Sequence, residues 1–179
     1  MNGRRRIAMA SPAHPYEPDI ALVGCGRWLR RDDQAGLMVA GMIGRLPPAG
    51  CRVIVTEAPG TDIPAVLGDI RLLVIADAAR SAVGHPPGSV ARMDYWEHKE
   101  HLRTRCRTDT HTLSVDLALE LAEEIGDLPR DVWIYAITAE DCGYGEEVSP
   151  AVARAIPEAV AVIEKDIAAW RSAQETCHA

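Results

Sequence analysis

The sequence predicts an α/β fold: a single three-layer domain whose twisted, mostly parallel sheet of about five strands carries helices on both faces. Short apolar runs alternate along the chain with segments of helical periodicity, and this alternation is typical of parallel or mixed sheets. The length of 179 residues corresponds to about one domain. The hydrophobic content of 47% disfavours disorder, and no apolar run approaches the ~18 residues of a membrane span.

The predicted strands are apolar or β-branched runs bounded by glycine, proline or charged residues. They cover residues 20–24, 51–56, 72–76, 89–93 and 132–137. The third, Leu-Leu-Val-Ile-Ala, is the most hydrophobic and is expected at the centre of the sheet. The fourth follows Pro86-Pro87-Gly88 and is expected at an edge.

The predicted helices show apolar residues three and four positions apart. The first begins at Asp32-Asp33, because acids suit a helix N-terminus, and it ends before Pro47-Pro48. A short helix covers residues 62–67.

Two longer helices follow in the second half of the chain. The last begins at the capping pair Ser149-Pro150 and is expected to kink or restart at Pro157. The one before it ends at the C-cap residue Gly126. Its apolar positions are Leu113, Leu117, Ala118, Leu121, Ala122 and Ile125. Residues 94–110 are polar and show no clear period, so we expect a long surface loop there.

Charge and cysteine content exclude several classes of protein. The net charge of −7 disfavours a nucleic-acid binder. The five cysteines are odd in number and form no CxxC pair, which disfavours a disulfide framework or a zinc ribbon. They suit a reducing compartment, so we expect a cytoplasmic protein that does not bind a membrane. Residues 1–18 are expected to form a disordered leader, 19–172 the domain and 173–179 a tail.

Ligands of parallel α/β sheets bind beyond the carboxyl ends of the strands, so polar residues there are candidates for a site. Gly24-Cys25-Gly26 fits a dinucleotide site only in part, because Leu29 occupies the position of the next glycine. A tight strand-to-helix turn is the better interpretation. If Asp32 caps the helix that follows, Asp33 lies in its first turn and points toward the strand ends.

Two further residues complete a candidate set. Asp77 directly follows the central apolar run, where an acid is either a helix cap or a site residue. His111 precedes a helix whose N-terminus favours neutral imidazole, the form that binds metals, although a loop histidine with a structural hydrogen bond is the alternative. Two carboxylates and one imidazole suit a divalent transition metal with open positions. His98 and His101 lie among arginines and are interpreted as a solvated or partner-facing patch.

Several of these features occur together in one known family. Residues 24–36, Gly-Cys-Gly-Arg-Trp-Leu-Arg-Arg-Asp-Asp-Gln-Ala-Gly, resemble the opening motif of nickel-iron hydrogenase maturation endopeptidases, GxGN followed by D-[DE]-x-x-G. The family's Gly-Thr is matched by Gly60-Thr61, its Asp after a hydrophobic strand by Asp77, and its His before a leucine-rich helix by His111. A late strand, an [ST]-P pair and a closing helix complete the order at residues 133–150.

The resemblance implies a phosphorylase/hydrolase-like fold and a specific activity. Members of the family remove a C-terminal extension from the large-subunit precursor of a nickel-iron hydrogenase by one cut, after nickel has been inserted. The catalytic and metal-contacting residues would be Asp33, Asp77 and His111. The nickel would belong to the substrate, so no tightly bound cofactor of the protein's own is expected. The partner would be the precursor of the hydrogenase large subunit. The protein itself is expected to be a monomer.

The resemblance leaves the chemistry of the cut open. A carboxylate could act as the base for a water molecule, or the metal could polarise the carbonyl group. Covalent catalysis by Cys25 is disfavoured because no histidine is fixed near it in sequence. The alternatives from other classes are a non-catalytic escort of the precursor and a free-standing metallohydrolase.

The chain departs from the family pattern at three positions. Arg27 replaces the usual Asn, Ser114 stands where a glycine is common, and Glu147 replaces a glycine before the late [ST]-P. These departures fit a distinct substrate subgroup or a relative that has lost activity, and the joint match at Asp33, Asp77 and His111 favours retained activity.

Overall fold

A computed structural model describes residues 18–80, 85–105 and 115–177. Within these ranges five strands form a sheet in the order β2-β1-β3-β5-β4. The strands are β1 (Ile20–Cys25), β2 (Cys51–Thr56), β3 (Leu72–Arg80), β4 (Val90–Asp94) and β5 (Asp131–Ala139). All pairings are parallel except that of β4, which lies antiparallel to β5 at the edge. The predicted fold class, the central position of β3 and the edge position of β4 are confirmed.

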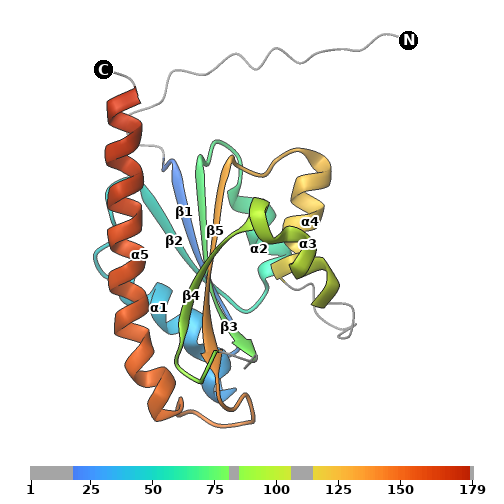
Figure 1. The fold of residues 1–179 in the computed structure, drawn as a ribbon, viewed down its shortest axis with the longest axis vertical. Helices are drawn as coiled ribbons and strands as arrows, with labels where there is room; N and C mark the ends of the chain where they lie inside the picture. The colour runs from blue at the N-terminus through green and yellow to red at the C-terminus, as the bar shows by residue number, and fades with distance from the viewer. Residues whose placement is uncertain (1–17, 81–84, 106–114, 178–179) are drawn as a thin grey trace.

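Helices cover both faces of the sheet and complete three layers (Figure 1). One layer contains α1 and α5, and the other contains α2, α3 and α4. The helices are α1 (Ala35–Ile43), α2 (Pro59–Val66), α3 (Tyr95–Arg105), α4 (Val115–Ile125) and α5 (Pro150–Cys177), with a 3₁₀ turn, η1 (Arg31–Gln34), before α1.

The side chains of the central strands alternate between two hydrophobic cores. In β1, Ile20 and Leu22 pack toward α1 and α5, whereas Ala21 and Val23 pack toward the opposite layer. Successive side chains of a strand point to opposite faces, and both faces are covered here. This explains why the central strands are continuous apolar runs in the sequence.

Two glycines allow α1 to lie directly on the sheet. A Cβ atom on Gly36 would lie 2.2 Å from the carbonyl oxygen of Ala76, and one on Gly24 would lie 2.3 Å from the Cβ of Ala40. Neither position can hold a side chain without movement of the helix. The structure therefore supports the interpretation of the glycine motif as a tight strand-to-helix turn.

The surface loop predicted over residues 94–110 is wrong in its first part, where Tyr95–Arg105 form α3. The remaining residues, 106–110, lie outside the described ranges. The sequence of α3 has no apolar stripe and so carries no helical signal. Contacts with α4 hold the helix instead, including the ion pair between Lys99 and Glu123, whose nitrogen and oxygen lie 2.5 Å apart.

The buried face of α4 differs from its most hydrophobic face. Its buried residues are Val115, Ala118, Leu119 and Ala122. Three of the apolar residues noted in the sequence are exposed, with relative accessibilities of 45% to 59%: Leu117, Leu121 and Ile125. The buried face therefore combines Val115 and Leu119 with two small alanines, which pack against the second hydrophobic core.

The last helix, α5, begins as the sequence predicts. The Ser149 hydroxyl accepts a hydrogen bond from the N–H of Val152 at 3.4 Å, which confirms the cap. The helix is continuous through Pro157, so the predicted restart does not occur. It also extends to Cys177, and so includes most of the segment 173–179 that is predicted from the sequence to be a tail. Among the described helices, none combines the length and the apolar character needed to cross a membrane.

Candidate active site

The carboxyl ends of the parallel strands meet at one end of the sheet, toward which the arrowheads of β3 and β5 point in Figure 1. The ladder between β1 and β3 ends at the pair Gly24 and Ala76. Asp77 is the first residue of β3 beyond that ladder, and it still pairs with β5. The sequence places Asp77 just after the strand, whereas β3 continues to Arg80. The carboxyl group is nevertheless at the predicted edge.

Asp33 reaches the same edge from η1. Its N–H donates to the carbonyl oxygen of Arg30 at 3.0 Å, which closes the turn. Burial raises the pKa of the Asp33 carboxyl group, and the guanidinium groups of Arg27 and Arg30 oppose that rise. The negative charge of Asp33 in turn raises the pKa of Asp77. Since η1 and β3 are also in contact, the fold places the two acids at the same edge of the sheet.

Asp77 has the properties of a site residue rather than those of a helix cap. Its pKa is raised to about 7, mainly by burial, with smaller contributions from the charges of Asp33 and Asp116. The N–H of Ala78 donates to its Oδ1 at 2.9 Å and opposes the rise. Asp77 lies inside a strand and therefore caps no helix. A carboxyl group that titrates near neutral pH is typical of functional sites.

Asp32, the neighbour of Asp33, has a structural role that differs from the expected one. It does not cap η1 but is fully buried and accepts three backbone hydrogen bonds from the β5–α5 loop. The donors are the N–H groups of Glu140 (2.8 Å), Asp141 (3.0 Å) and Ser149 (2.5 Å). Burial alone would raise the pKa of Asp32, but the three donors outweigh it and hold the pKa below its usual value. Asp32 therefore fixes the loop beside Asp33.

His111, the third predicted residue, lies outside the described residues, as does Ser114. The described chain resumes at Val115, the first residue of α4, and the charge of the next residue, Asp116, acts on Asp77. Within the ranges that the structure describes, no group of three or more histidine, cysteine, aspartate or glutamate side chains is arranged to hold a metal ion. The role of His111 stays a prediction.

The cysteines near the acids are poorly suited to act as nucleophiles. Cys25 is buried, and burial, followed by the charges of Asp77 and Asp62, raises the pKa of its thiol far above the usual value. Cys142 is half-buried, and burial and the charge of Asp33 raise its pKa. Since the thiolate is the nucleophilic form, the raised pKa values disfavour both thiols as nucleophiles at neutral pH. Sequence reasoning missed the position of Cys142, although it follows the end of β5 as Asp77 follows the core of β3.

Two loops at this end form a joined surface, here called the two-loop platform (residues 27–31 and 140–146). The N–H of Arg31 donates to the carbonyl oxygen of Gly145 at 3.0 Å, and the N–H of Gly145 donates to that of Leu29 at 2.9 Å. Leu29 and Arg31 have φ angles of 62° and 45°. This left-handed conformation costs roughly 1–2 kcal/mol per non-glycine residue, so the hydrogen bonds must hold it in place.

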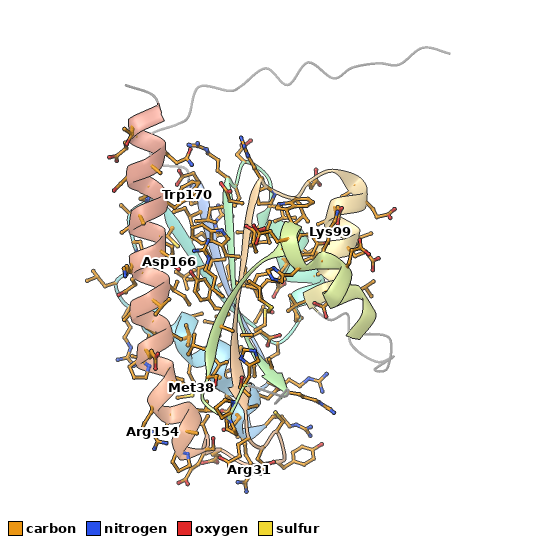
Figure 2. All side chains as sticks on the ribbon, in the orientation of Figure 1. Arg31, Met38, Lys99, Arg154, Asp166 and Trp170 are labelled. Carbon is orange, nitrogen blue, oxygen red and sulfur yellow. The ribbon has the colours of Figure 1, made fainter. Side chains whose placement is uncertain are left out.

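The two-loop platform presents large apolar side chains to solvent. Trp28, Leu29 and Tyr144 have relative accessibilities of 48%, 57% and 84%. The guanidinium carbon of Arg30 lies 4.6 Å from the centre of the Tyr144 ring. Figure 2 shows Arg31, a neighbour of these residues, at the end of the molecule below the strand arrowheads. Exposed aromatic residues beside a site are typical of surfaces that bind a partner.

Two of the three departures from the family motif, Arg27 and Glu147, are among the described residues. Arg27, in place of the usual Asn, is exposed, and its charge lowers the pKa of Asp33. Glu147 is exposed in the β5–α5 loop.

These features define a class of protein: a three-layer α/β protein with two neighbouring carboxyl groups at the carboxyl edge of a mostly parallel sheet. The sequence matches the family model described as hydrogenase maturation protease over residues 55–166, more than half of the chain. The chain therefore belongs to the hydrogenase maturation protease family, and it is a peptidase. The matched segment contains Asp77 and His111, whereas Asp33 precedes it.

Solved structures show the same fold. The hydrogenase maturating endopeptidase HybD from E. coli is 20% identical, with a TM-score of 0.70 over 86% of this chain and 93% of that one. The maturation proteases HycI and HybD from Thermococcus kodakarensis are 21% and 22% identical, with TM-scores of 0.62 and 0.59. They align over 83% and 82% of this chain and over 92% and 97% of their own. No curated protein matches the sequence.

Proposed function

We propose that this protein removes a C-terminal extension from the large-subunit precursor of a nickel-iron hydrogenase, and that it recognises the nickel already held by that precursor. The observation that supports the proposal most strongly is the coupling of Asp33 and Asp77 at the strand ends of a chain from this family. His111 is proposed as the third contact to nickel, on the basis of its match to the family motif.

The proposed role of the two carboxylates is to grip a metal that the substrate carries. Oxygen and imidazole ligands form a weak site for nickel, which suits a contact that must form and break with each precursor. Binding one substrate atom in this way holds one peptide bond at a fixed place, and such positioning contributes to the rate. No resident metal is needed, so we propose that the protein has no tightly bound cofactor. We also propose that it works in the cytoplasm as a monomer.

Water activation is assigned to the same pair of acids. A base works best when its pKa is near the working pH, and the pKa of Asp77 is about 7. Asp77 is therefore the better candidate to accept a proton from the attacking water, and Asp33 the better candidate to remain bound to the metal. The raised pKa values of the Cys25 and Cys142 thiols favour direct attack by water over a covalent intermediate.

Substitution of the three residues tests the proposal. Asp33→Asn, Asp77→Asn and His111→Ala should each block conversion of the nickel-loaded precursor to its mature size, with circular dichroism like that of the wild-type protein. Asp69→Asn, an exposed acid after α2, is the matched control and should process normally. Normal processing by all three site variants would contradict the proposal. Binding of the precursor by the wild-type protein without any change in its mass would favour an escort instead.

A further inference from the structure

One hydrogen-bonding group of Arg30 has no partner among the residues that the structure describes. Its Nε atom is buried and has no acceptor among the described residues. A buried unpaired donor costs roughly 1–3 kcal/mol, and native proteins leave few of them. Because the charge of Arg30 acts on Asp33, this donor lies near the candidate site, where a ligand can supply the acceptor.

Arg30 is also held rigidly beside the acids. Its backbone forms a bridge with Gly145, and its guanidinium lies over the ring of Tyr144. Its carbonyl oxygen accepts the N–H of Asp33, and its charge acts on the Asp33 carboxyl group. A donor fixed by the two-loop platform needs little reorganisation when a substrate binds.

The surroundings of Arg30 decide which acceptor fits. Asp33 and Asp77 are the acids of the site, and Asp141 lies in the same platform, where it pairs with Arg31 at 3.4 Å. Because these carboxylates are so close, a further carboxylate from the substrate is disfavoured as the acceptor for Arg30. A neutral peptide carbonyl oxygen fits better, since it brings no charge to the ground state and gains negative charge as the bond is hydrolysed.

We propose that Arg30 donates a hydrogen bond to the carbonyl oxygen of the scissile peptide bond and stabilises the oxyanion that forms there. This inference rests on the proposed function. The water oxygen bonds to the carbonyl carbon, the π electron pair moves to the carbonyl oxygen, and a site carboxylate takes the proton of the water. When the carbonyl reforms, the C–N bond breaks and the proton passes to the leaving amine.

Single-turnover cleavage of nickel-loaded precursor at varied enzyme concentration tests the role of Arg30. Arg30→Gln should lower the maximal rate about 100-fold, as loss of one oxyanion donor does elsewhere, and should change the half-saturating concentration less than about threefold. Arg30→Lys keeps the charge but loses the planar geometry, so its rate should fall about tenfold. Arg52→Gln, an exposed arginine on β2, is the matched control and should match the wild-type protein.

The outcomes separate the inference from the function on which it rests. A wild-type rate for Arg30→Gln, or a loss seen only as weaker binding, overturns the role of Arg30 and leaves the protease function intact. Absence of cleavage by the wild-type protein overturns both. If Arg30→Gln does not fold, the test passes to Arg30→Lys, for which a wild-type rate overturns the inference.

Discussion

Replacement of Asp32 by Asn should destabilise the protein by about 2.5–6 kcal/mol. One oxygen of Asp32 accepts from Glu140 and Asp141, and the other accepts from Ser149 at 2.5 Å. An Asn side chain can keep its oxygen toward the first pair only by turning its NH₂ group toward the N–H of Ser149. The change therefore removes one hydrogen bond to a charged acceptor, worth about 1.5–3 kcal/mol, and leaves a buried donor unpaired at about 1–3 kcal/mol.

Urea denaturation followed by circular dichroism at pH 7 measures this change in the free energy of unfolding. Asp69→Asn is the matched control and should lie within about 0.5 kcal/mol of the wild-type value. The folded pKa of Asp32 is below its unfolded value of about 3.9, so its contribution is complete above that pH and is lost as the pH falls through the folded pKa. The difference between the two proteins should therefore shrink below about pH 4. A destabilisation under about 0.5 kcal/mol at pH 7 would refute the role assigned to Asp32.

Three further predictions concern neighbouring residues. Asp77→Asn should stabilise the fold by about 4 kcal/mol at pH 8 and by almost nothing at pH 4, because the raised pKa of about 7 destabilises the folded state only as the pH rises from about 4 to 7. Equal stabilisation at both pH values would contradict this. Cys25→Ala should keep its processing activity, and the Cys25 thiol should resist a disulfide reagent until the protein is unfolded; loss of cleavage in folded Cys25→Ala would restore covalent catalysis. Gly36→Ala should lower the free energy of unfolding by more than about 3 kcal/mol, because its Cβ would collide with backbone oxygens. Gly41→Ala, with open space around it, should raise the free energy of unfolding by about 0.5–1 kcal/mol in thermal or urea unfolding. Similar effects of the two substitutions would contradict the packing of α1.

The sequence predicted the parallel sheet because strands buried on both faces are almost purely apolar. That pattern appears without ambiguity at β1 and β3, and the rule that strand ends carry the site then leads to Asp33 and Asp77. Asp77 follows the run that packs the centre of the sheet, so its position could be predicted before any contact was known.

Other features depend on contacts between distant segments, which periodicity does not reveal. Nothing local indicates α3, a polar helix held through contacts such as that of Lys99 with α4. The three donors to Asp32 come from residues more than a hundred positions away. The bridge between Arg30 and Gly145 likewise joins two loops that the sequence separates, and the platform could not be seen without it.

The most direct test of the account is the mass of the large-subunit precursor after incubation with this protein. Nickel-loaded and nickel-free precursor are incubated in parallel, and intact-mass spectrometry follows the C-terminus of each. Elemental analysis of the dialysed protease, before mixing, checks that it brings no metal of its own. The account predicts a single C-terminal loss from the nickel-loaded precursor alone. Equal cleavage of the nickel-free precursor, or an unchanged mass in both samples, would contradict it.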